Sequence, residues 1–138
     1  MSLLRDLDDV RRTLRDSPFQ RLFEIEPLDL DRMQGAVRFG VAFKPDYARV
    51  EGENQIHGGV VAALIDIAGD YALAVHLGHF VPTIDLRIDY MRPAVGRLEV
   101  SARVVRVGRT VGVVDAEVAG ADSRLVAVGR GLFGTRSG

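Results

Sequence analysis

The sequence contains no cysteine, and this absence excludes several kinds of chemistry. A chain without thiols cannot form a disulfide bond, use a thiolate nucleophile or build a zinc site from thiolate ligands. His76 and His79 lie three residues apart where a long helix is expected to end, with no evident third ligand. We therefore predict that they interact with the negative end of the helix dipole, and we predict no metal site.

The chain also lacks a large net charge. Its 18 basic and 19 acidic residues give a formal charge of -1, and the arginines are scattered among acids rather than gathered in a stripe. Nucleic-acid binding depends mainly on a basic surface that contacts phosphates. We therefore expect no nucleic-acid partner.

Neither a signal peptide nor a membrane segment is expected. The first ten residues contain Arg5 and three aspartates, where a signal peptide needs an uninterrupted apolar run. Residues 58–75 approach the length of a membrane span, but Asp66 and Asp70 lie in the middle, where lipid would make charges costly. We predict a cytoplasmic protein in which this stretch is a buried helix.

Size and composition indicate one globular domain over residues 1–138. Of the 138 residues, 47% are hydrophobic and 27% charged, and the chain has no internal repeat, low-complexity tract or linker. Within residues 1–18, apolar side chains at three- and four-residue steps predict a short amphipathic helix that Ser17 and Pro18 interrupt.

Most of the remaining chain alternates between apolar and polar residues, which is typical of strands. Six strands are predicted, at residues 23–31, 36–43, 83–91, 98–107, 110–118 and 125–133. Pro27 shifts the alternation of the first strand and indicates an edge strand or a bulge. Residues 44–56 form a loop of the length usually associated with function.

One long helix, apolar on almost every side, is predicted at residues 58–77. It would be about 30 Å long at the standard helical rise. An antiparallel sheet curled around this helix fits the pattern, but one small sheet covers the helix incompletely and leaves its own edges unpaired. A symmetric dimer that joins two sheets edge to edge would solve both problems.

Residues 54–70, NQIHGGVVAALIDIAGD, carry the candidate chemistry. Gly58 and Gly59 stand at the start of the helix, where unpaired N–H groups and the positive end of the dipole can stabilise developing negative charge. This is the physical basis of an oxyanion hole. The alternative is that the glycine pair forms only a tight junction between loop and helix.

Asp66 lies about two turns after Gly58, with no local charged partner. A buried, unpaired carboxylate is costly and is retained mainly for function or for a specific partner. Asp70 lies one turn further on the same face, and each carboxylate would make the other harder to ionise if both faced one cavity. Alternatively, both aspartates meet arginines or a dimer partner.

These residues resemble the hotdog-fold acyl-CoA thioesterases of the phenylacetate-pathway (PaaI-like) type, within the 4-hydroxybenzoyl-CoA thioesterase superfamily. The resemblance rests on HGG at 57–59, on Asp66 nine residues after the histidine, and on TIDLRIDYMRPA at 83–94. It continues through RVGR at 106–109 and VGRG at 128–131. It implies an α+β hotdog fold, in which about six antiparallel strands wrap around one central helix.

The resemblance also implies a role for each residue of the motif. Asp66 would act across a dimer interface, opposite the partner subunit's HGG, as general base on water or as nucleophile through an anhydride. The N–H of Gly58 would hold the thioester oxygen, His57 would shape that site, and Gly59 would leave room. Thr83 would place a hydroxyl near the water or substrate, or else be a core-facing threonine.

Two positions depart from the family pattern. Relatives often have Asn or Gln six residues before the histidine, where this chain has Glu51, and Asn54 is only three before it. Either Asn54 serves in a rearranged loop, or the water-orienting amide is absent. Asp70 stands where some relatives have a small hydroxyl residue, and we include it among the residues near the substrate.

Other residues are candidates for contact with the substrate. Arg92 and Arg109, with Arg106, could bind the phosphates of coenzyme A, although solvated surface arginine is the favoured alternative. The acyl pocket would be lined by the partner subunit and by side chains from the helix and the loop after it, namely Tyr71, Leu73, Val75 and Phe80.

The predicted function is hydrolysis of an acyl-CoA by a homodimer or a dimer of dimers, without a cofactor beyond the coenzyme A of the substrate. The alternative is a non-catalytic hotdog protein that binds acyl-CoA or another small ligand, because the amide is displaced and Asp70 is unusual. A hotdog hydratase would need a different arrangement of acid and histidine.

Overall fold

The computed structural model describes residues 3–136. Its elements are α1 (Leu7–Asp16), η1 (Gln20–Leu22), β1 (Ile25–Asp31), β2 (Ala36–Val41), η2 (Pro45–Tyr47), α2 (Gly58–Leu77), β3 (Thr83–Tyr90), β4 (Leu98–Val107), β5 (Val111–Gly120) and β6 (Leu125–Gly134). The six predicted strands and the long helix after the second strand are therefore confirmed. The strand ends differ from the prediction by no more than two residues.

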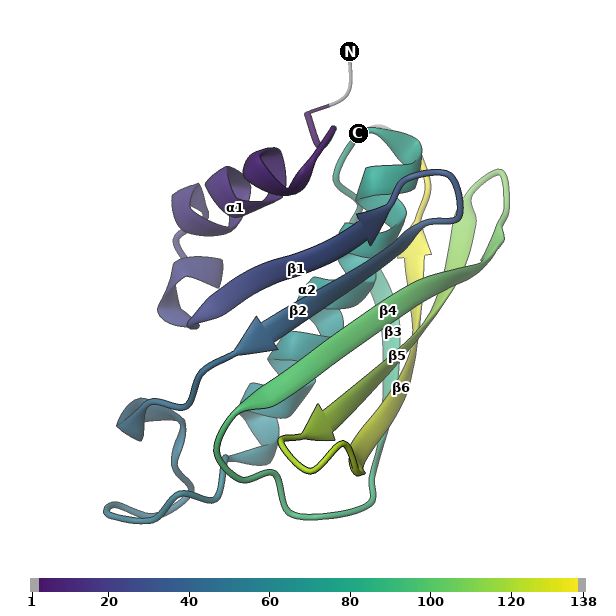
Figure 1. The fold of residues 1–138 in the computed structure, drawn as a ribbon. Helices are drawn as coiled ribbons and strands as arrows, with labels where there is room; N and C mark the ends of the chain where they lie inside the picture. Colours follow the sequence, from purple (N-terminus) through teal and green to yellow (C-terminus); the bar gives the residue numbers. More distant parts are fainter. Residues whose placement is uncertain (1–2, 137–138) are drawn as a thin grey trace.

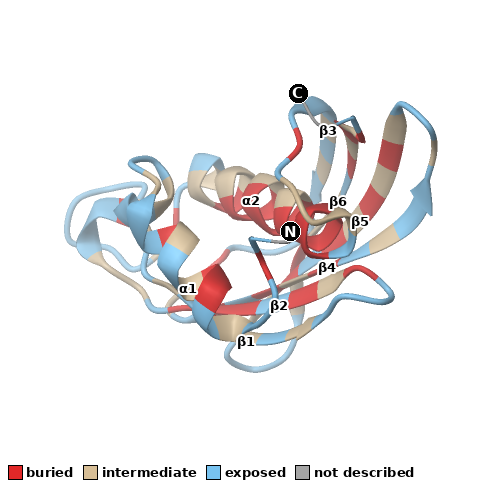
Figure 2. Ribbon diagram, turned by 90° about the horizontal axis from the view of Figure 1, so that it is seen from above, coloured by how far each residue is buried: buried red, intermediate tan, exposed pale blue. Residues whose placement is uncertain are grey.

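The strands form one antiparallel sheet in the order β1-β2-β4-β5-β6-β3. The sheet curls around α2, and α1 lies beside β1 (Figure 1). Buried residues concentrate along α2 and at alternate strand positions (Figure 2). The predicted sheet wrapped around a central helix is thus confirmed. Pro27 lies at a register shift in β1, which is an edge strand, as its place in the sequence indicated.

The N-terminal helix α1 is shorter than the predicted span of residues 1–18. It begins at Leu7 because the side chain of Asp6 accepts the N–H of Asp9 at 2.9 Å and caps the first turn. It ends at Asp16, two residues before Pro18. The part of the prediction that falls on residues 1 and 2 lies outside the described residues.

The central helix α2 has its predicted bounds. His57 caps its start, and Gly78 ends it at φ 89°, a left-handed conformation that glycine adopts without strain. By length and composition this helix could cross a membrane, but most of it is buried inside the protein. It is therefore the core helix that its two internal aspartates predicted.

Two glycines let α2 lie close to the sheet. A β-carbon on Gly69 would come within 2.8 Å of the ring of Phe133 on β6, and one on Gly129 within 2.9 Å of the side chain of Ile65. Both distances are shorter than carbon atoms tolerate in a packed core. The middle of α2, which carries Asp66, is therefore held directly against β6.

The strand β3 forms an open edge of the sheet and, within residues 3–136, pairs only with β6. Large apolar side chains along and just beyond it are exposed, with Ile84 at 57%, Tyr90 at 54% and Met91 at 51%. An edge that presents unpaired backbone groups and apolar side chains is a template for pairing with another strand.

Candidate active site

The loop before α2 is fixed by backbone hydrogen bonds. The N–H of Ile56 donates to the carbonyl of Ala94 at 2.7 Å, and the N–H of His57 donates to the carbonyl of Tyr47 at 2.8 Å. The exposed His57 ring accepts the N–H of Gly59 on Nδ1 at 2.8 Å. Because Nδ1 is an acceptor, the neutral imidazole carries its hydrogen on Nε2.

Gly58 is the first residue of α2, and its N–H has no hydrogen-bond partner among residues 3–136. Its carbonyl accepts the hydroxyl hydrogen of Tyr90 at 2.6 Å, which ties the start of α2 to the end of β3. A free N–H at the positive end of a helix dipole can hold a negatively charged oxygen. This geometry fits the oxyanion-hole prediction, whereas the N–H of Gly59 is already occupied.

The contact made by Tyr90 was not anticipated from the sequence. Tyr90 was assigned only to a strand, and 32 residues separate it from Gly58. No local pattern reports which strand end lies beside the helix start, so the sequence carried no signal for this bond.

The carboxylate of Asp66 points toward the start of β3. Its Oδ1 accepts the hydroxyl hydrogen of Thr83 at 2.6 Å. Thr83 is exposed, so the alternative of a core-facing threonine is wrong. Asp66 is partly buried and forms no salt bridge within the described part of the chain.

Asp70 lies one turn after Asp66 and contacts the same short segment. Its Oδ1 accepts the N–H of Val81 at 3.3 Å. Burial raises the pKa of Asp70 to about 7, the Val81 N–H acts in the opposite direction, and the nearby charge of Asp66 raises the pKa further. Asp70 therefore titrates near neutral pH.

The two halves of the predicted site are separated within one chain. Asp66 lies eight residues after Gly58, which corresponds to about 12 Å along the helix axis. Strand β3 shows the same separation, because Thr83 at its start holds Asp66 and Tyr90 at its end holds Gly58. A single chain therefore does not bring the carboxylate and the free N–H together.

The predicted phosphate ligands lie at opposite ends of the sheet. Arg92 lines a pocket of about 330 Å³ that Gly58, Tyr90 and Arg49 also line, and one of its N–H groups donates to the carbonyl of Leu125 at 2.7 Å. Residue 109 lies instead in the hairpin between β4 and β5, near the C-terminal end of α2 (Figure 1). Arg92 and Arg109 of one chain thus cannot bind the same phosphate group.

Asn54, the candidate for the displaced amide, is exposed in the loop before α2. It lines a hollow of about 650 Å³ together with Phe43 and Val95. Glu51 is also exposed in this loop. Both residues belong to the Gly58 half of the site rather than to the Asp66 half.

Three of the predicted acyl-pocket residues are core residues. Tyr71 and Leu73 are 0% exposed and Val75 is 1% exposed, so they do not line a ligand pocket in this structure. The hydroxyl of Tyr71 instead hydrogen-bonds to Thr13 and donates to Gln20, which anchors the N-terminal segment on α2. Of the predicted set, only Phe80 is exposed.

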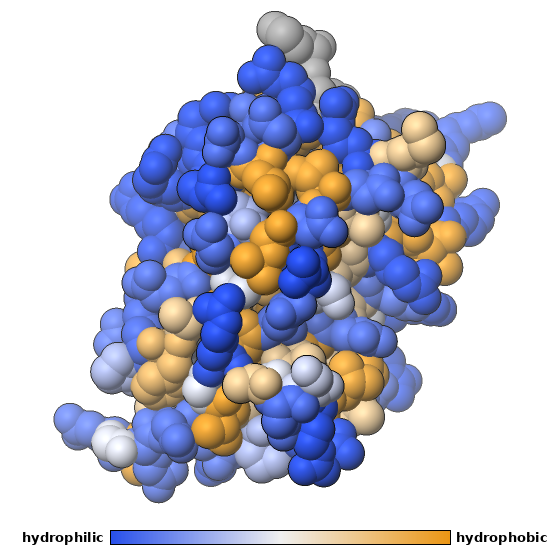
Figure 3. All heavy atoms as spheres, in the orientation of Figure 1, coloured by the Kyte–Doolittle hydropathy of each residue, from blue (hydrophilic) through white to orange (hydrophobic). Residues whose placement is uncertain are grey.

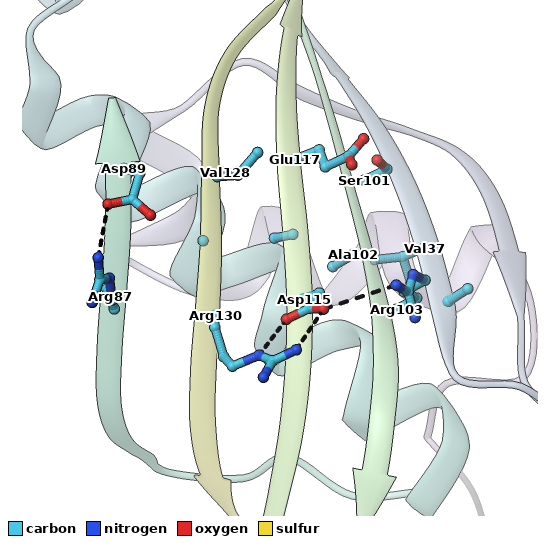
Figure 4. A pocket seen from close by; sticks show the side chains of 13 residues that line it. Val37, Arg87, Asp89, Ser101, Ala102, Arg103, Asp115, Glu117, Val128 and Arg130 are labelled. Carbon is cyan, nitrogen blue, oxygen red and sulfur yellow. Dashed lines mark hydrogen bonds and ion pairs between the residues drawn. The ribbon is translucent and has the colours of Figure 1, made fainter. Parts of the chain in front are cut away.

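A hollow of about 520 Å³ lies on the face of the sheet away from α2 (Figure 4). Arg130 binds Asp115 through two hydrogen bonds at 2.6 and 2.9 Å, and these hold the pKa of Asp115 below its usual value. Arg87 pairs with Asp89 nearby at 3.3 Å. Seen as in Figure 1, the molecular surface is largely hydrophilic (Figure 3). None of the predicted site residues lines this hollow.

Residues 3–136 contain no group of three or more His, Asp or Glu placed to hold a metal ion. His76 Nδ1 lies 3.0 Å from the carbonyl oxygen of Arg32, and His79 Nδ1 lies 3.0 Å from that of Phe80. Each imidazole therefore contacts a loop carbonyl at the C-terminal end of α2.

Comparison with known structures agrees with the fold described above. A thioesterase-superfamily protein of known structure is 33% identical, with a TM-score of 0.85 over 94% of this chain and 98% of that one. The Escherichia coli PaaI protein from the phenylacetic acid degradation operon is 23% identical, with a TM-score of 0.81 over 94% and 91% of the two chains. The sheet wrapped around α2 is thus the hotdog fold of these proteins.

The chain belongs to the Thioesterase superfamily, whose profile matches residues 53–127, more than half of its length. This match includes both halves of the candidate site, from the HGG to β3. A predicted esterase of Halobacterium salinarum is 48% identical over 92 residues, which make up 59% of this chain and 61% of that protein.

Proposed function

We propose that this protein is a thioesterase that hydrolyses an acyl-CoA to the free acid and coenzyme A. The observation that carries the proposal is that strand β3 contacts both halves of the candidate site, one at each of its ends. Thr83, at one end of β3, donates to the Asp66 carboxylate. Tyr90, at the other end, donates to the carbonyl of Gly58, the residue whose own N–H is free. A general base and an oxyanion donor are the two groups that hydrolysis of a thioester needs.

In the proposed reaction, a water oxygen bonds to the thioester carbon while Asp66 takes one proton from that water. The carbonyl oxygen becomes negative and is held by the N–H of Gly58. The carbon–sulfur bond then breaks, the acid leaves, and the proton passes from Asp66 to the coenzyme A thiolate. Attack by Asp66 itself through an anhydride would use the same two residues.

We propose a homodimer in which the β3 strands of two chains pair antiparallel. Such pairing places the start of one β3 beside the end of the other, so Asp66 of one chain approaches the partner's Gly58. The open β3 edge and its exposed apolar side chains support this arrangement. Each dimer would then contain two sites, and a dimer of dimers would use other surfaces.

The same arrangement assigns roles to the remaining residues. Arg92 and the pocket beside Gly58 would receive part of the coenzyme A, while Arg109 would approach the same substrate only from the partner chain. His57 would keep the Gly58 turn in shape through the Gly59 N–H, and Asn54 would border the entrance. We further propose that the protein acts in the cytoplasm.

Release of coenzyme A from aryl-, short-, medium- and long-chain acyl-CoA tests the proposal. Asp66→Asn should reduce kcat by at least about 100-fold, because it removes the base while keeping an oxygen for the Thr83 hydroxyl. Asp16→Asn, an exposed acid at the end of α1, is the matched control and should retain activity.

Full activity of the Asp66→Asn variant would contradict the assignment. If coenzyme A thioesters bind to the wild-type protein but none is hydrolysed across the panel, the protein is instead a non-catalytic acyl-CoA binder.

A further inference from the structure

Asp70 lies beside Asp66 and has no role in the proposed reaction. The two residues are one helical turn apart on the same face of α2. Both contact the same segment, since Asp66 accepts from the Thr83 hydroxyl at 2.6 Å and Asp70 accepts from the Val81 N–H at 3.3 Å. Two carboxyl groups are therefore held side by side against the start of β3.

Among residues 3–136, the charged group that acts on Asp70 is Asp66. On α2 the next residue, Tyr71, directs its hydroxyl toward Thr13 and Gln20. The segment leading into β3 contributes the neutral Val81 N–H. No arginine, lysine or histidine forms a salt bridge with either carboxyl group within residues 3–136. The interaction between the two aspartates is thus not screened by a paired cation.

We propose that Asp70 is a positioning residue for Asp66, and that the charge on Asp70 sets how readily Asp66 takes a proton from the attacking water. This inference rests on the proposed thioesterase function. Two neighbouring charges act on each other, so a charge on Asp70 also acts on the Asp66 carboxyl group.

Ionisation of Asp70 places a negative charge one helical turn from the Asp66 carboxyl group, where the two β-carbons of such a pair are about 5–6 Å apart. This charge makes the Asp66 carboxylate a stronger proton acceptor, and it therefore favours transfer of the water proton to Asp66. The negative charge then moves from Asp66 to the thioester oxygen, which the partner's Gly58 would hold further from Asp70. Hydrolysis should accordingly become faster as Asp70 loses its proton, by about three- to tenfold.

The test is the dependence of kcat on pH from 5 to 9 in the wild-type protein and in the Asp70→Asn variant. Asparagine has the same shape and can still accept the Val81 N–H, but it cannot ionise. The wild-type profile should contain a rise near pH 7 that the variant lacks, and Asp70→Glu should restore part of that rise. A purely structural role would lower kcat equally at every pH, so profiles of identical shape would overturn the inference.

A second measurement separates failure of this inference from failure of the proposed function. The side-chain carbonyl carbons of ¹³C-labelled aspartate are followed by NMR during a pH titration without substrate. In the wild-type protein the Asp66 signal should respond in two steps, and in the Asp70→Asn variant in one. If the two aspartates titrate together but no thioester is hydrolysed, the coupling is supported and the thioesterase function is contradicted. If thioesters are hydrolysed but the Asp66 titration is the same in both proteins, the coupling is contradicted.

Discussion

Substitution of Gly58 by proline would remove one N–H from the candidate site and change little else. Gly58 is the first residue of α2, where proline is well tolerated because the N–H is not needed by the helix. The residue before a proline must be extended, and His57 already has φ -61° and ψ 137°. A β-carbon at this position would lie 3.5 Å from the Tyr90 ring, an ordinary contact.

The expected loss follows from the role of that N–H. Removal of one oxyanion donor costs about 100- to 1000-fold in kcat, or about 3–4 kcal/mol of transition-state stabilisation. The fold should not suffer, because a compatible proline usually stabilises by about 0.4–1 kcal/mol through the unfolded chain. The Gly58→Ala variant carries the same β-carbon but keeps the N–H, so its kcat should stay within about threefold of wild type.

The assay compares kcat for acyl-CoA hydrolysis and the midpoint of urea denaturation for the three proteins. Slow turnover of the proline variant alone, with an unchanged or higher midpoint, is the expected result. A proline variant that is as active as the alanine variant would refute the reasoning. The thioester oxygen would then be bound elsewhere, and the N–H of Gly59 could serve only by leaving His57.

Three further predictions concern stability. The pKa of Asp70 is about 7 in the folded protein and near 3.8 in the unfolded chain, so between these pH values the folded protein binds one more proton than the unfolded chain. The free energy of unfolding of the wild type therefore falls as the pH rises through this range. The free energy of unfolding of Asp70→Asn, measured relative to that of wild type by denaturant titration at equal protein concentration, should therefore rise by on the order of 3 kcal/mol from pH 5 to pH 8. Gly69→Ala should destabilise by about 1–2 kcal/mol, because the added carbon meets the Phe133 ring, and a raised urea midpoint would contradict this. Asp6→Ala should cost about 0.5–2 kcal/mol by removing the α1 cap, measured by thermal unfolding, and no change would mean that the cap is dispensable.

Much of the fold could be predicted because particular residues mark where its helices and strands begin and end. The bounds of α2 followed from the glycine pair at its start and from Gly78 at its end, where the backbone adopts a conformation suited to glycine. The start of α1 was missed because apolar spacing extends back to Leu3, while the capping side chain of Asp6 decides where the helix begins. Periodicity thus identifies an element, but specific hydrogen bonds set its ends.

The site was predicted less completely because its contacts depend on strand register. The bond from Tyr90 to Gly58 joins residues 32 apart, and that from Val81 to Asp70 joins residues 11 apart. Residue type gave no sign of either bond. The burial of Tyr71 was likewise hidden, because α1 and η1, which supply its hydroxyl partners, lie more than 50 residues earlier.

The separation of Asp66 from Gly58 leads to a prediction for mixed dimers. If each site combines Asp66 of one chain with the partner's Gly58, the Asp66→Asn and Gly58→Pro variants should each keep no more than about 1% of wild-type activity. Random mixing after denaturation and refolding makes about half of the dimers heterodimers, and one of the two sites in each heterodimer has both groups intact. About a quarter of wild-type activity should therefore return, because half of the sites in half of the dimers are complete. Sites built within one chain would recover nothing, since every chain in the mixture carries a defect.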